Sequence, residues 1–287
     1  MSGRTIELVA IGTVMVAVAT LVAQSRKEYR FNVGPKAGIS VNNPYGAISV
    51  KPSPGNTVVV SAVLSSNKVE VDSSQTDNRV DIQSHLLPGA DADSGHVDYE
   101  ILVPPDASVS LRSMTGPLRA ERLHGDMTLE GAAALVDVHD VSNAHVHVKT
   151  LNGPVTLTNV LEGHIEVDSL SGAITLNRVN GPLVQVISTS GGINYTGDFG
   201  DGGEYRLTSH SGDIEATVPE YTSADVSARS VKGEVRDDIP LQPKQHTSFI
   251  VKEGSAFVGT MGRAAASSTV VLRTFSGKIH LRKRADK

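Results

Sequence analysis

The sequence predicts an all-β fold, a parallel β-solenoid with about nine or more coils of 18–23 residues, preceded by one N-terminal hydrophobic helix. Three observations indicate this fold: a short phrase recurs at a nearly fixed period, apolar and polar residues alternate between the phrases, and aromatic residues are scarce. Aromatic residues are 4% of the chain and tryptophan is absent, so Val, Ile, Leu and Ala must build the core. Such a core suits thin, layered β-structure better than a globule built around large rings.

The N-terminal segment, residues 1–30, is interpreted as a signal-anchor or a signal peptide. Residues 8–25 carry no charge and are mostly Val, Ala, Leu and Ile. About 20 apolar residues cross a bilayer as a helix, so this run is just long enough. Cleavage after Ala19 would fit the small-x-small pattern, whereas Arg26 and Lys27 close behind the apolar run favour an uncleaved anchor. Both alternatives place the rest of the chain in the cell envelope, in the periplasm or at the cell surface.

Residues 31–111 are predicted to form an N-terminal β-cap together with irregular early coils. Strand-like segments of half-coil size occur there, but their spacing is less regular than in the rest of the chain. They lie at residues 47–50, 57–64, 68–71, 79–82 and 96–103. A cap is expected because a solenoid needs its open end covered.

Residues 112–287 are predicted to form the regular solenoid, which ends in a basic tail from Lys278 to Lys287. The recurring phrase is a small polar residue, a glycine, one variable residue and an aliphatic, as in Ser171-Gly172-Ala173-Ile174. The glycine is expected to permit the turn into each coil, the polar residue before it to cap the turn, and the aliphatic to stack in the core. The aligned aliphatics are Leu118, Val136, Val155, Ile174, Ile193, Ile214, Val235, Ala256 and Ile279.

The fixed register favours a solenoid over a sandwich or barrel built from strands of similar length. Val141, Val160 and Val179 occupy equivalent positions 19 residues apart. Each coil of a solenoid must rest on the same footprint as its neighbour, whereas a sandwich has no such requirement.

A resemblance to a known family follows from these residues. The strand at residues 97–103 ends in Pro104-Pro105 and is followed by Ser108-Val109-Ser110-Leu111 and then by the serial Ser-Gly-x-Ile phrases. In this combination the chain resembles the putative adhesin family of bacterial envelope proteins, β-strand-repeat domains of unknown function, over roughly residues 38–285. The resemblance implies a right-handed single-chain β-solenoid exposed at the envelope, and it implies no catalytic residues.

A candidate metal site arises from the alignment of the repeats. Asp126, His145 and His164 occupy equivalent positions in successive coils, and His147 and Glu166 lie at the next outward positions. Ladder partners in neighbouring strands lie about 5 Å apart. Imidazole and carboxylate groups at that separation can bind Zn²⁺ or a similar ion. The alternative is a solvated polar ladder that binds no ion, and no cofactor is predicted.

A second, weaker candidate is the glycine-rich stretch at residues 197–204, which contains Asp198, Asp201 and Glu204. Closely spaced carboxylates among glycines can bind Ca²⁺. The stretch lacks the spacing of an EF-hand, and a plain turn is the alternative interpretation.

Enzymatic activity is not predicted. There is no cysteine, which excludes thiol catalysis and disulfides, and no nucleophile elbow, phosphate loop or HExxH motif is present. A polysaccharide-processing β-helix enzyme would need clustered carboxylates. The outward charged residues Arg119, Asp137, Glu215 and Arg236 are instead spread over different coils.

The predicted function is therefore that of a non-enzymatic bacterial cell-envelope β-solenoid, an adhesin-like binding or surface-scaffold protein. Expected partners are a cell-wall polysaccharide, another surface protein or further copies of the chain, and the inner membrane if the N-terminal helix is uncleaved. The net charge of −5 predicts no nucleic-acid partner. The alternatives are a polysaccharide-processing enzyme and a structural or signalling-associated ectodomain without a ligand.

Overall fold

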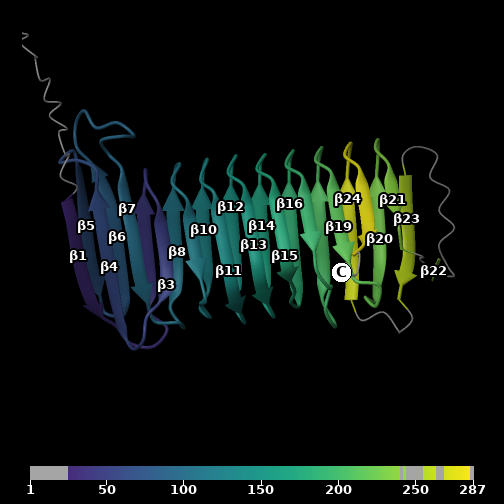
Figure 1. Ribbon diagram of the computed structural model, residues 1–287, viewed down its shortest axis with the longest axis horizontal. Coiled ribbons are helices and arrows are strands. Elements are labelled where there is room, and N and C mark those ends of the chain that lie inside the picture. The colour runs from purple at the N-terminus through teal and green to yellow at the C-terminus, as the bar shows by residue number, and fades with distance from the viewer. Residues whose placement is uncertain (1–24, 240–241, 244–254, 263–267, 285–287) are drawn as a thin grey trace, which may run out of the picture.

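The computed structural model describes residues 25–239, 242–243, 255–262 and 268–284, which form strands and no helix. The strands lie side by side along a rod (Figure 1), and one continuous apolar core fills the space between its two sheets. The all-β prediction is confirmed. The predicted N-terminal helix falls within residues 1–24, outside the described residues, and none of the described segments is a helix able to span a membrane.

Two sheets, here called sheet A and sheet B, make up the rod. In spatial order, sheet A contains β1 (Ser25–Asn32), β4 (Thr57–Leu64), β7 (Val97–Val103), β3 (Ile48–Pro52), β9 (Leu118–Glu121), β11 (Val136–Ser142), β13 (Val155–Leu161), β15 (Ile174–Val179), β17 (Ile193–Thr196), β19 (Ile214–Val218), β25 (Ile279–Lys283) and β21 (Val235–Asp237). Sheet B contains β22 (Gln242–Pro243), β23 (Ser255–Met261), β20 (Ala224–Ser230), β24 (Ser268–Thr274), β18 (Glu204–Ser209), β16 (Leu183–Ser188), β14 (His164–Ser169), β12 (His145–Thr150), β10 (Met127–Gly131), β8 (Ser108–Ser113), β2 (Gly38–Asn43), β6 (Arg79–Leu86) and β5 (Val69–Thr76).

The middle of the rod follows the predicted register. Each coil consists of one sheet B strand followed by one sheet A strand, and neighbouring coils pair in parallel, as in Val146↔Ile165 and Val155↔Ile174. These four side chains are fully buried, while the residues between them along each strand point outward. Outward residues at equivalent positions therefore form straight ladders from coil to coil. The residues of the candidate metal site lie on such ladders.

The glycine of the recurring phrase serves close stacking of coils rather than an unusual backbone conformation. A Cβ on Gly172 would lie 1.9 Å from the carbonyl oxygen of Gly153 in the preceding coil, and one on Gly191 would lie 2.1 Å from that of Gly172. All three glycines lie outside the positive-φ region. The expectation that this glycine permits the turn conformation is thus wrong, because the space between coils is what excludes a side chain.

The residue that caps each turn is also different from the one expected. Ser209, which is buried, accepts a hydrogen bond from Gly212 N at 2.9 Å, whereas Ser211, next to the glycine, is exposed. Hydroxyl groups three residues before the glycine act in the same way in four other coils, at Ser113, Thr150, Ser230 and Thr274. A column of buried hydroxyls therefore runs along this corner of the rod.

The order of coils at the C-terminal end differs from the order in sequence. Ile279 of β25 pairs with Ile214 of β19 on one side and with Val235 of β21 on the other. The last coil, β24–β25, is thus inserted between two earlier ones, so the last strand of the chain, β25, lies within the row of strands (Figure 1). Ala256 belongs to β23, which pairs antiparallel with β20, so the predicted coil at Ala256 is wrong.

The N-terminal end of the rod is covered by antiparallel strands. β4 pairs with β1 and with β7, and β5 pairs with β6. The parallel strands β2 and β3 lie inside these antiparallel strands, against β8 and β9. Antiparallel covering of this kind ends the stack of parallel coils.

Candidate metal centre and corner groove

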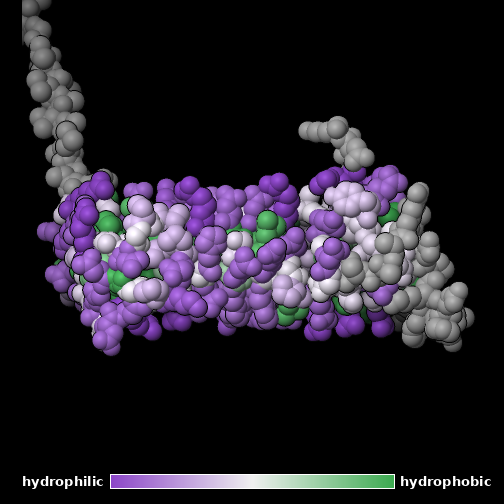
Figure 2. Space-filling model, turned by 90° about the horizontal axis from the view of Figure 1, so that it is seen from below, coloured by the Kyte–Doolittle hydropathy of each residue, from purple (hydrophilic) through white to green (hydrophobic). Residues whose placement is uncertain are grey.

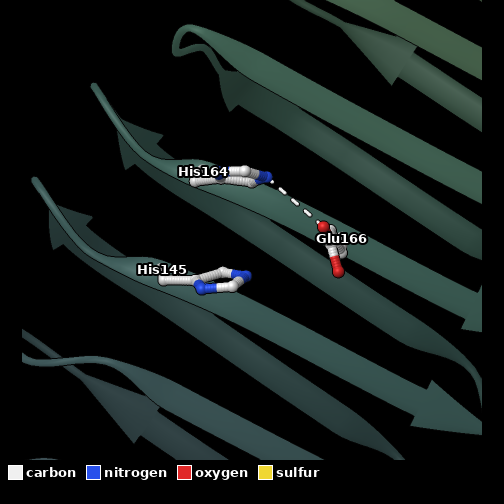
Figure 3. A group of neighbouring side chains, drawn as sticks. All are labelled: His145, His164 and Glu166. Carbon is white, nitrogen blue, oxygen red and sulfur yellow. Dashed lines mark ion pairs between the residues drawn. The ribbon is translucent and has the colours of Figure 1, made fainter.

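The candidate metal centre lies on the outward face of β12 and β14. His145 pairs in register with His164, and His147 pairs with Glu166. The rings of His145 and His164 lie with their centroids 4.7 Å apart, and Glu166 extends toward His164 (Figure 3). The parallel pairing of two consecutive coils thus brings together side chains that are about 20 residues apart in sequence.

The separations within this group suit a small metal ion. His164 Nε2 lies 3.3 Å from Glu166 Oε1, and one ligand atom from each of His145, His164 and Glu166 lies within 4.8 Å of the others. Tetrahedral coordination with bonds of 2.0–2.1 Å places ligand atoms about 3.3 Å apart. His145 is exposed and the other two are half-buried, so a bound ion would keep positions open to solvent.

The structure does not bring the other two predicted ligands, Asp126 and His147, into this group. Asp126 lies just before β10, and its Oδ1 accepts a hydrogen bond from the backbone N–H of His145 at 3.1 Å. His147 Nε2 lies 3.7 Å from the carboxylate of Asp168. Asp168 was not among the predicted residues, although its position two residues after Glu166 places it on the same face.

The glycine-rich loop after β17 is held by aromatic packing, and in the part of the chain that the structure describes its carboxylates belong to no group of three potential metal ligands. Phe199 stacks on Tyr195 with ring centroids 4.8 Å apart. Asp198 Oδ1 accepts a hydrogen bond from Thr222 at 3.1 Å, while Glu204 forms an ion pair with Arg206. These carboxylates engage different partners, so within the described residues the loop reads as a packed turn rather than a calcium site.

The outward charged residues Arg119, Asp137, Glu215 and Arg236 form local contacts. Asp137 pairs in register with Arg119, Glu215 Oε1 lies 2.8 Å from Arg282 Nη1, and Arg236 Nε lies 3.0 Å from Glu234 Oε1. Each contact is local to one or two strands. The four candidate residues therefore do not converge on one cleft.

A groove follows the corner where the sheet B strands end. This corner groove has a volume of about 820 Å³ and extends from Asn42 on β2 to Thr189 after β16. Met114, Leu151 and Leu170 line it with exposed fractions of 53%, 54% and 49%. Figure 2 shows one face of the rod, which is mainly hydrophilic and carries few hydrophobic patches.

Residues 37–282 match the family model described as Toastrack DUF4097, and none of the curated proteins compared with the chain matches it. A putative adhesin from Bacteroides fragilis is similar in structure, with 14% identity, a TM-score of 0.50, and coverage of 91% of this chain and 98% of that one. A putative adhesin from Parabacteroides distasonis has 15% identity and a TM-score of 0.37, with coverage of 92% and 98%. At this identity, the likeness to the Bacteroides protein shows the fold alone.

Proposed function

The chain belongs to the Toastrack DUF4097 family, and we propose that it is a non-enzymatic bacterial cell-envelope protein, an adhesin-like binding or surface-scaffold solenoid. One observation carries this proposal: outward polar side chains repeat in register along the sheet faces, as in Thr156, Thr175 and Asn194 on sheet A. Their spacing of about 4.8 Å is fixed by backbone pairing. A rigid surface with a translational repeat suits an extended, repetitive partner better than a small substrate.

The apolar run at residues 8–25 supports the envelope location. Retained, it would anchor the rod at the inner membrane, and cleaved, it would release the rod into the periplasm or to the cell surface. The similar structure from Bacteroides fragilis is named a putative adhesin, which agrees with a binding role at the envelope.

A capture experiment tests this function. The full-length chain is immobilised and exposed separately to isolated cell-wall polysaccharide and to envelope proteins, and retention of one of them is expected. Two matched variants locate the surface, one with Thr156→Arg and Thr175→Arg on sheet A and one with Thr128→Arg and Gln185→Arg on sheet B. Failure to retain either material would favour the ectodomain without a ligand, and release of shortened sugars would favour the enzyme.

We further propose that His145, His164 and Glu166 bind a divalent transition-metal ion, with Zn²⁺ as the probe. The carrying observation is the convergence of three ligand atoms on two rigid, hydrogen-bonded strands. Strand pairing orders these residues before the ion binds, which lowers the entropic cost of forming the site. Three protein ligands leave a position for water or for a ligand group of a partner.

Calorimetric titration with Zn²⁺ tests the metal site. Wild type should bind with saturation, and the His145→Ala/His164→Ala variant should bind at least about 100-fold more weakly, because it loses two of three ligands. The matched control is His85→Ala/His124→Ala, which removes two exposed histidines outside the site and should bind like wild type. Equal binding by wild type and the His145→Ala/His164→Ala variant would show that the ladder is only a solvated surface.

A further inference from the structure

Four charged residues alternate in sign along the corner groove. Arg112, Glu130, Lys149 and Asp168 occupy one ladder position on β8, β10, β12 and β14, and each pairs in register with the next. All four line the groove. Their charges sum to zero, so the ladder offers no net attraction to a uniformly acidic or basic polymer.

A second row lies two residues further along the same four strands, at the turn. Its members are Met114, Ala132, Leu151 and Leu170, which also line the groove. The backbone continues the pairing of coils through these turns, since Asn152 N donates to Ala132 O at 2.8 Å. Both rows are therefore held on one rigid frame and share the coil spacing.

We propose that two copies of the chain associate through the corner groove, antiparallel to each other, about a two-fold axis that passes between β10 and β12. Such an axis places β10 of one copy opposite β12 of the other, and β8 opposite β14. Arg112 then faces the second copy's Asp168, and Glu130 faces the second copy's Lys149. An alternating row of even length is complementary to its own reverse, which an isologous interface requires.

The same two-fold axis also brings the apolar row of one copy against the apolar row of the other. It places Met114 opposite the second copy's Leu170, and the small Ala132 opposite the second copy's Leu151. A small residue facing a large one lets the two surfaces interdigitate. Exposed Leu151 and Leu170 would be removed from water, which supplies the main driving force.

The extent of the groove agrees with this axis as well. Its lining starts at Asn42 on β2 and ends at Ile187 on β16 and Thr189 beyond it, and these two strands are equidistant from the line between β10 and β12. Six strands spaced by about 4.8 Å extend about 24 Å from the first strand axis to the last, which suits a small specific interface.

Three of the four charged residues already have a partner in their own chain: Arg112 and Glu130 pair with each other, and the Asp168 carboxylate lies 3.7 Å from His147 Nε2. Arg112 Nε lies 3.1 Å from Glu130 Oε2, and Arg112 Nη2 donates to Glu130 Oε1 at 3.2 Å. A guanidinium has five N–H donors, so Arg112 can keep this contact and still donate to the second copy's Asp168.

Charge-reversed variants test the two-fold register directly. Arg112→Glu/Lys149→Glu makes the row all negative, and Glu130→Lys/Asp168→Lys makes it all positive. Wild type should be dimeric by sedimentation velocity, each variant alone should self-associate at least about 100-fold more weakly, and their equimolar mixture should form a heterodimer. The full chain is used throughout, with a chelator present so that a metal ion does not bridge the copies.

Two controls keep the result interpretable. Arg119→Glu/Arg236→Glu makes the same change in net charge on sheet A and should dimerise like wild type. If a charge variant fails to fold by circular dichroism, Leu151→Lys replaces it, because this side chain is already exposed and its substitution should also abolish the dimer. Wild type that remains monomeric at every concentration, variants that dimerise like wild type, or a mixture that does not associate would each overturn the proposal.

Discussion

Replacement of Gly191 by alanine is expected to destabilise the solenoid by about 2–4 kcal/mol. The new Cβ would lie 2.1 Å from Gly172 O and needs at least 3.0 Å, so the coils must separate by 0.9 Å. The same shift would lengthen the bond from Ser190 N to Leu170 O from 2.9 Å to 3.8 Å, which is no hydrogen bond. Loss of one or two such bonds costs about 0.5–1.5 kcal/mol each, and overpacking adds about 1–3 kcal/mol.

The adjacent residue provides the matched control for this substitution. A Cβ on Gly192 would meet only Asp213 O at 3.6 Å, and Gly192 lies outside the positive-φ region. Gly192→Ala should therefore be neutral or stabilise by up to about 1 kcal/mol through the unfolded state. Urea unfolding of both variants and wild type measures the difference. A Gly191→Ala midpoint equal to that of Gly192→Ala would refute the stacking argument.

The remaining predictions concern buried hydroxyl groups. Ser209→Ala should cost about 1–3 kcal/mol in urea unfolding because it leaves Gly212 N unpaired, whereas Ser209→Thr should be tolerated, since Thr150 and Thr274 fill the equivalent position in other coils. An equal loss from both substitutions would contradict the capping role. Burial raises the pKa of Tyr99 and Tyr205 from 10.0 to about 12, so both should stay protonated at pH 11 in a phenolate absorbance titration. Because the folded-state pKa lies above the unfolded value of 10.0, the contribution of these tyrosines to the free energy of unfolding is complete below pH 10 and is lost as the pH rises toward 12. A free energy of unfolding that does not change with pH in this window would contradict the prediction.

The sequence was sufficient to predict the middle of the rod because its signal there is local. A period-2 pattern places Val146 and Ile165 inside, and a 19-residue step places them on adjacent rungs, as the structure confirms. The same step brought His145 beside His164, so the three-residue candidate metal group also follows from register alone. Register does not fix side-chain rotamers, which is why Asp126 and His147, also predicted as ligands, turned to other partners.

Two structural reasons for the recurring phrase were missed, and both depend on contacts between coils. The glycine is crowded by a carbonyl of the preceding coil, and the capping hydroxyl lies at the end of the strand, as with Ser209 and Gly212. The hydroxyl column is visible in the sequence as a Ser or Thr three residues before each glycine of the recurring phrase. Only the stacked geometry distinguishes it from the more conspicuous polar residue next to the glycine.

The order of the coils could not be predicted from the repeat, for a reason inherent in the repeat itself. Coils that share one footprint can stack on one another in any order, so Ile279 fits on Ile214 as well as Val235 would. What separates the alternatives is the end of the stack. β20 pairs in parallel with β24 on one side but antiparallel with β23 on the other, and an antiparallel neighbour cannot continue the solenoid. The coil β20–β21 must therefore be terminal, and β24–β25 must enter between it and β18–β19. Specificity in this chain thus resides in the irregular strands at its ends, while the regular repeat provides the frame that holds the corner groove and the histidine ladder.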